Sequence, residues 1–143
     1  MTAVPTADGA RTLRDLRVPA LTGGLGLAAV ALLHLRDPHV SGSYGSCPIL
    51  RLTGLPCPGC GGLRAVNDLS RGDLVAAVSS NALVVALSLG LVASWIVWAV
   101  RRAGGQHRAR LIDVSTRTAL LVLPVIAVFG VVRNTPWASW LAP

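Results

Sequence analysis

Three cysteines are the residues of this chain whose type and spacing are best suited to chemistry. Cys57 and Cys60 form a C-x-x-C pair followed by Gly61, and Cys47 lies shortly upstream. A two-residue spacer allows both thiolates to bind one metal ion, and a glycine after the second cysteine permits a tight turn with positive φ. The same pair also fits thiol–disulfide chemistry, because C-x-x-C brings two sulfur atoms within bonding distance.

A structural zinc site requires four ligands, and the cysteines provide three of them. The candidates for the fourth ligand within this chain are His39, His34 and Asp68, and another chain is the alternative source. The chain has no second C-x-x-C pair, so the sequence indicates only part of a zinc site. The cofactor therefore stays open, with zinc as the candidate.

Two other interpretations of the cysteines also stay open. An oxidising environment would favour a disulfide, either Cys57–Cys60 or Cys47 with one of them, which leaves one thiol for exchange or for a partner. Alternatively, the segment is a tightly turned structural cap on the neighbouring helices and performs no chemistry.

Three functions correspond to these interpretations. The first is a non-enzymatic membrane module whose three-cysteine loop binds a metal ion or a partner protein. The second is a component of a membrane thiol–disulfide oxidoreductase that uses Cys57 and Cys60, with Cys47 as the resolving or shuttle thiol. The third is a structural subunit of a membrane complex. We predict no catalytic residues outside the cysteines, because no phosphate loop, carboxylate pair or Ser-His-Asp arrangement can be placed in the sequence.

The composition is that of a membrane protein. Hydrophobic residues make up 52% of the chain and charged residues only 13%, against about 25% charged in soluble domains. The net charge of +7 comes from arginine alone, since the chain contains no lysine. Nucleic acid is excluded as a partner, because the arginines flank apolar blocks and no basic face with aromatic residues is present.

The apolar residues fall into three blocks that predict helices over residues 18–35, 74–100 and 118–132. The third block contains Pro124 and is shorter than the ~20 residues that usually cross a bilayer. It would span with flanking arginines reaching outward. We therefore predict an all-α integral membrane protein with three transmembrane helices and a Cys-rich loop between the first two. Residues 1–17 form a cytoplasmic tail, and residues 18–143 form a single membrane domain whose Cys loop covers residues 36–73.

Particular residues in the helices predict how they pack. Gly23, Gly24 and Gly26 give the first helix a thin face on which another helix can pack closely. Trp95 and Trp98 near the end of the second helix fit an aromatic belt at the membrane surface.

Polar residues next to the cysteines are predicted to support the loop. Residues 63–70 form a short helix with its apolar residues on one face and Arg64 and Asp68 on the other, and Asp73 caps the helix that follows. A loop that folds back over helix ends needs hydrogen-bond partners for its buried backbone. Asn81 and the nearby serines are candidates for these partners.

Arg133 is a further candidate for supporting the loop, and the sequence allows two positions for it relative to the membrane. Either it marks the end of the last helix, with Trp137 and Trp140 at the membrane surface, or that helix continues and leaves Arg133 within the membrane. An intramembrane arginine is a candidate functional residue. In both cases its guanidinium can donate hydrogen bonds to the loop.

The arginines also predict an orientation. Eight lie in the tail and in the loop after the second helix, and five lie on the other side. This distribution favours a cytoplasmic N-terminus and an extracytoplasmic cysteine loop. Arginine in place of lysine, with abundant alanine, valine and glycine, is typical of GC-rich bacterial genes. We expect a multi-pass protein of the bacterial plasma membrane, with lipid and another membrane protein or a second copy as partners.

The cysteine segment resembles a known family. The run from Cys47 to Ala65, then Arg71-Gly72-Asp73 and Asn81, is similar to the bacterial membrane proteins grouped as domain of unknown function 2752, and the similarity extends over residues 44–136. The late Arg133-Asn134-Thr135-Pro136 is similar to the Arg-Asn-x-Pro ending of that family. Departures are expected at Gly62, Leu63 and Ala82. The resemblance implies a small multi-helix membrane protein and implies no activity.

Overall fold

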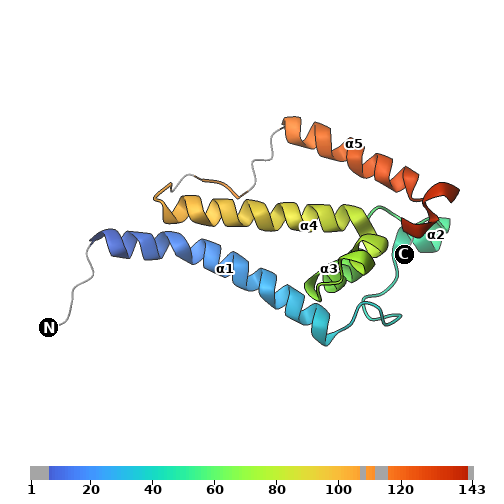
Figure 1. Cartoon of the computed structure of the whole chain (residues 1–143), viewed down its shortest axis with the longest axis horizontal. Coiled ribbons are helices and arrows are strands. Elements are labelled where there is room, and N and C mark those ends of the chain that lie inside the picture. The colour runs from blue at the N-terminus through green and yellow to red at the C-terminus, as the bar shows by residue number, and fades with distance from the viewer. Residues whose placement is uncertain (1–6, 107–108, 112–115, 142–143) are drawn as a thin grey trace.

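The computed structural model describes residues 7–106, 109–111 and 116–141. This part of the chain is all-helical and contains no strand. Figure 1 shows three long helices with α4 (Leu74–Ala103) between α1 (Ala7–Leu35) and α5 (Thr116–Val132). The short helices α2 (Pro48–Thr53) and α3 (Gly62–Ser70) and the 3₁₀ helix η1 (Pro136–Leu141) lie together at one end of the long helices.

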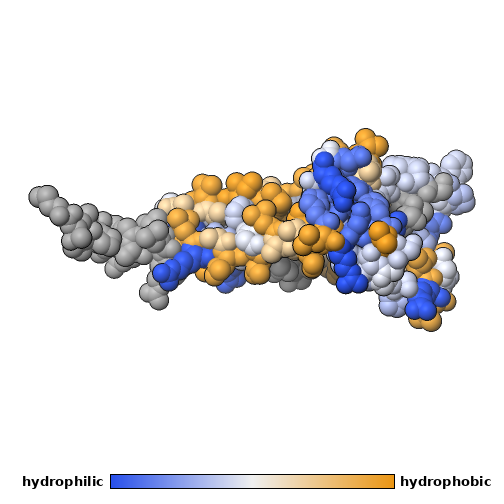
Figure 2. All heavy atoms as spheres, turned by 90° about the horizontal axis from the view of Figure 1, so that it is seen from below, coloured by the Kyte–Doolittle hydropathy of each residue, from blue (hydrophilic) through white to orange (hydrophobic). Residues whose placement is uncertain are grey.

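Two helices are long and apolar enough to cross a membrane, namely residues Leu16–Leu35 of α1 and the whole of α4. α5 has 17 residues and is a shorter apolar helix. Of the three predicted transmembrane helices, the first two are thus candidate spans by length and composition, and a third span is not confirmed. Most large apolar side chains of the long helices are exposed, and Figure 2 shows them along the length of the molecule. Hydrophilic side chains gather at the end that carries the cysteine loop.

The first helix starts earlier than the apolar pattern predicted. α1 begins at Ala7 rather than at Val18, so much of the predicted tail is helical. Alanine, leucine and arginine are all strong helix formers, which allows a polar segment to extend an apolar helix.

α1 packs on α4 through one of its glycines. A Cβ at Gly23 would lie 2.6 Å from the Trp95 ring, so only glycine permits this contact. Gly24 and Gly26 have no atom within 4 Å of their Cβ positions, so the predicted thin face is confirmed at one of three glycines. Trp95 Nε1 also donates to Thr22 Oγ1 at 3.1 Å, which ties the tryptophan to α1.

The Cys loop is more helical than expected. The predicted helix over residues 63–70 is present as α3, and Asp73 caps α4 by accepting from the Ala76 N–H at 2.9 Å. α2 was not predicted; Pro48 at its first turn and Gly54 in the left-handed conformation (φ 73°) define it. α3 packs on α4 through a buried apolar cluster, in which Ala65 of α3 meets Ala77 and Val85 of α4.

Candidate metal centre

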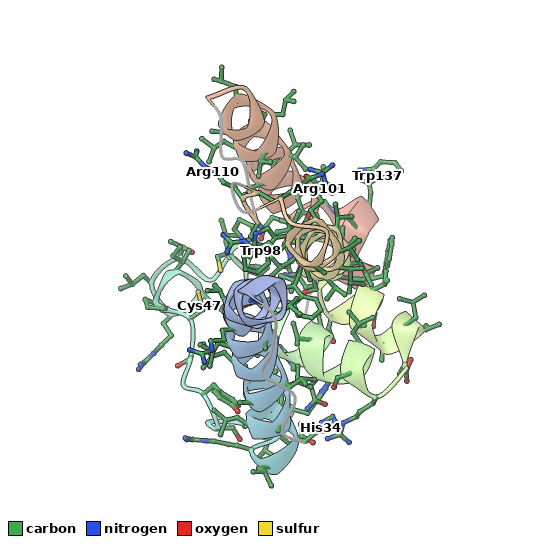
Figure 3. All side chains as sticks on the ribbon, turned by 90° about the vertical axis from the view of Figure 1, so that its left-hand side faces the viewer. His34, Cys47, Trp98, Arg101, Arg110 and Trp137 are labelled. Atoms are coloured by element: carbon green, nitrogen blue, oxygen red, sulfur yellow. The ribbon has the colours of Figure 1, made fainter. Side chains whose placement is uncertain are left out.

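The three cysteines converge in space, and we refer to Cys47, Cys57 and Cys60 as the cysteine cluster. Cys47 is the N-cap residue of α2, and the other two cysteines flank the Pro58-Gly59 turn. The sulfur of Cys57 lies 3.4 Å from that of Cys47 and 3.2 Å from that of Cys60. All three sulfur atoms lie within 4.8 Å of one another. Cys47 is labelled in Figure 3, on the loop that leads into α2.

The turn between the paired cysteines has the conformation that the sequence predicted. The Cys60 N–H donates to the Cys57 carbonyl at 3.0 Å, and Gly61 adopts φ 77°. A side chain at Gly61 would be strained at this φ, so the glycine is required for the chain to turn into α3. This turn brings the second sulfur back toward the first.

Arg133 holds this turn from the other end of the sequence. Its guanidinium Nη1 donates to the carbonyl oxygens of Cys57 at 2.9 Å and Cys60 at 3.1 Å, with Pro58 at 3.4 Å. α5 ends at Val132, as one of the two interpretations expected, but the Arg133 side chain points inward and is only 1% exposed. Phe129 stacks against it at 5.3 Å. Arg133 therefore adds a charged hydrogen-bond donor to the carbonyls of the cysteine turn.

Two asparagines complete this support. Asn81 is fully buried, and its Nδ2 donates to the Pro58 carbonyl at 2.8 Å and the Cys60 carbonyl at 2.9 Å. Asn81 interrupts α4 with extended backbone (φ −169°), and its Oδ1 accepts from the Val84 N–H at 3.0 Å, which restarts the helix. Asn134 donates to the Pro56 carbonyl at 3.0 Å. Sequence reasoning missed Asn134 as a support, although its position beside Arg133 was a usable signal.

The thiols of the cluster differ in acidity. The N–H of Leu50 at the start of α2, followed by the Cys57 thiol, lowers the pKa of Cys47 from 9.0 to about 7. Burial, followed by the neighbouring thiols, raises the pKa of Cys60 to about 12. In the reduced protein, Cys47 is thus deprotonated more readily than Cys60.

The other predicted ligands do not join the cluster. His39 Nε2 lies 2.7 Å from Asp68 Oδ1, and Ser80 donates to Asp68 Oδ2 at 3.0 Å. This order, Ser–Asp–His, places no histidine on the serine hydroxyl, so the serine is not activated as in a hydrolase triad. His34 lies on α1, away from Cys47 in Figure 3.

A cavity of about 390 Å³ opens beside the cluster. Its walls are the loop from Pro38 to Cys47 and the residues from Gly59 to Arg64. Cys47 and Cys60 face this cavity, together with His39 and Arg64. The cluster is therefore accessible from one side and held by Arg133 and the asparagines on the other.

The geometry suits a thiophilic metal ion. Thiolates bind Zn²⁺ at about 2.3 Å, which places neighbouring sulfurs of a tetrahedral site roughly 3.8 Å apart. The observed separations of 3.4 and 3.2 Å require only small movements to reach this spacing. Three sulfurs so arranged also permit disulfide formation, because Cys57 adjoins both other thiols.

The comparisons support the resemblance noted from the sequence. Residues 47–95 match the sequence profile of the family described as "Protein of unknown function (DUF2752)". The match covers the cysteine cluster, α2, α3 and most of α4, and is narrower than residues 44–136; the Arg-Asn-x-Pro similarity lies outside it. No curated protein and no solved structure shows significant similarity to the chain. Residues 47–95, which include the whole cysteine cluster, are thus similar to the DUF2752 family.

Proposed function

We propose that this chain is a small, non-enzymatic membrane module whose cysteine cluster binds one thiophilic metal ion, with zinc as the first candidate. The observation that carries the proposal is the convergence of three sulfur atoms within 4.8 Å. Three thiolates and a divalent ion carry one net negative charge, which the buried Arg133 beside the cluster would offset. The same arginine and Asn81 hold the turn in place, so the ligands are arranged before the ion binds.

Substitution of each cysteine tests the metal proposal. Cys47→Ser, Cys57→Ser and Cys60→Ser should each lower zinc affinity at least about 100-fold, since loss of a ligand exceeds the 10–100-fold effect of second-shell changes. Zinc affinity is measured on detergent-purified, reduced protein by competition with a chromogenic chelator. Ser79→Ala is the control, because this exposed serine bonds only the Ala76 carbonyl of its own helix. Three cysteine variants that bind zinc as the control does would refute the proposal.

A second candidate function is thiol–disulfide exchange, and the central position of Cys57 favours it. The Cys57 sulfur adjoins both other sulfurs, so a Cys57–Cys60 disulfide could exchange with the acidic thiol of Cys47. Oxidation of two thiols would release two protons and pass two electrons to a partner disulfide, which becomes a dithiol. A two-hydrogen mass deficit in protein purified without reductant, together with a measurable reduction potential, would favour this function over metal binding.

We also propose a location in the bacterial plasma membrane with the N-terminus in the cytoplasm. Two helices of suitable length and composition and the excess of arginine in the loop after α4 support it. Lipid is then one partner, and a second copy or another membrane protein would cover part of the exposed apolar surface. A membrane-impermeant maleimide applied to intact cells should label the cysteines of metal-depleted protein. Labelling only after lysis would reverse the proposed orientation.

A further inference from the structure

The cavity beside the cysteine cluster bears on what completes the metal site. Cys47 and Cys60 line it on one side, and the Ser-Gly-rich loop over residues 41–46 lines it on another. Its volume of about 390 Å³ is within the range of small-molecule pockets. A macromolecule would not enter a cavity of this size, except by a single side chain.

The part of the chain that the structure describes provides three ligands for the metal ion and no fourth. The three sulfur atoms lie within 4.8 Å of one another, and among the described residues no histidine or carboxylate belongs to this group. His39 lies on the cavity wall, but its Nε2 is engaged by Asp68 at 2.7 Å. Sites with three protein ligands typically take an exogenous fourth ligand, and the cavity is the side from which it would arrive.

Charge defines the class of that ligand. Three thiolates and one divalent ion together carry a single negative charge, and Arg133, which donates to the backbone of the turn, offsets it. Arg64 is a second arginine, half-buried in the cavity wall. Its positive charge remains for a ligand that enters the cavity, so a monoanion completes a neutral site.

The donor atom follows from the character of the metal site. Three thiolates transfer much charge to the ion, which weakens its power to acidify a bound water, and such soft sites prefer a further soft ligand. We propose that the cavity admits a low-molecular-weight thiol, whose thiolate takes the fourth position on the metal while Arg64 stabilises its charge. This inference rests on the proposed metal function and names the ligand of that site.

Cobalt(II) as a spectroscopic substitute for zinc tests this inference on the full chain in detergent. Metal-depleted, reduced protein is loaded with one equivalent of cobalt and titrated with 2-mercaptoethanol, and acetate serves as a hard monoanion for comparison. We expect the visible d–d bands of cobalt to shift toward those of a four-thiolate site, and the shift to saturate at one thiol per cobalt.

Acetate should cause no such shift. Arg64→Gln should weaken thiol affinity about tenfold without changing cobalt affinity, and Arg64→Lys should recover part of it.

Arg71→Gln is the matched control, because Arg71 pairs with Asp37 at 3.4 Å and does not line the cavity. Cobalt that binds but gives a spectrum insensitive to thiol overturns this inference and leaves the metal proposal intact. A thiol-insensitive spectrum that changes in His39→Gln identifies His39 as the fourth ligand. Absence of cobalt binding overturns both proposals. The same titration is repeated with a short peptide that carries one central cysteine. If the peptide saturates the cobalt spectrum as well as 2-mercaptoethanol does, the fourth ligand is a cysteine of a partner protein, and the small-molecule assignment is overturned.

Discussion

At the scale of single residues, Arg133 is the main support of the candidate site. Its guanidinium donates to the carbonyls of Cys57 and Cys60 in the cysteine turn, and it is nearly inaccessible to solvent. Hydrogen bonds from a charged donor of this kind contribute more to stability than neutral ones. The consequence is that the conformation of the cysteine turn depends on a residue at the far end of the chain.

Arg133→Gln should therefore destabilise the protein by about 2–4 kcal/mol and lower its zinc affinity about tenfold. Glutamine is shorter and uncharged, so it cannot reach all of these carbonyls. Thermal unfolding in detergent, followed by circular dichroism, measures the first effect. Arg71→Gln is the control, and its exposed ion pair with Asp37 should matter by less than about 1 kcal/mol. Equal melting temperatures for the two variants would contradict this role of Arg133.

The pKa values of Cys47 and Cys60 predict how their reactivity depends on pH. In reduced, metal-free protein, Cys47 with a pKa of about 7 is half thiolate near neutral pH, whereas Cys60 with a pKa of about 12 stays protonated. A lowered pKa means that the reactive form persists as pH falls toward 7 and is lost below it. Iodoacetamide labelling, followed by peptide mass mapping, should show Cys47 modified well before Cys60 at pH 7.5. Faster labelling of Cys60 would contradict the acidity order.

At the scale of the elements, the packing of α1 on α4 depends on Gly23. The Trp95 ring occupies the place of a Cβ there, so Gly23→Ala must displace the ring or separate the helices. We expect Gly23→Ala to lower stability by about 1–3 kcal/mol and to shift the tryptophan fluorescence.

Gly24→Ala is a matched control for this prediction, since nothing lies within 4 Å of its Cβ position. Alanine is the better helix former, so Gly24→Ala should be neutral or more stable by up to about 1 kcal/mol. Both variants are compared by their melting temperatures. If the Gly23→Ala and Gly24→Ala variants are equally stable, α1 and α4 do not make this close contact in solution.

The elements also show what the sequence could predict and why. The Asp73 cap, the positive φ of Gly61 and α3 depend on neighbouring residues, so local patterns predicted them. α2 was missed because its helix has only six residues and no apolar periodicity to indicate it. The hydrogen bond from Arg133 to Cys57 joins residues 76 positions apart, and no local pattern indicates such a contact.

At the scale of the whole molecule, the long helices and the cysteine loop have different surroundings. The described surfaces of α1, α4 and α5 expose many leucines and valines, whereas the loop end is polar (Figure 2). Exposed apolar surface of this extent indicates contact with lipid or with another chain. The cavity and the cluster lie at the polar end, so a metal ion or a small solute would reach them from water. This arrangement separates the apolar helices from the candidate site.

The most direct test of the central claim is the metal content and intact mass of detergent-purified protein, before and after alkylation without reductant. A three-cysteine metal site predicts one zinc per chain and thiols that are protected until a chelator removes the metal. Protein without metal whose three thiols alkylate at once would contradict the metal site. A mass lower by two hydrogens with one free thiol would contradict it as well and would assign the cluster to disulfide chemistry.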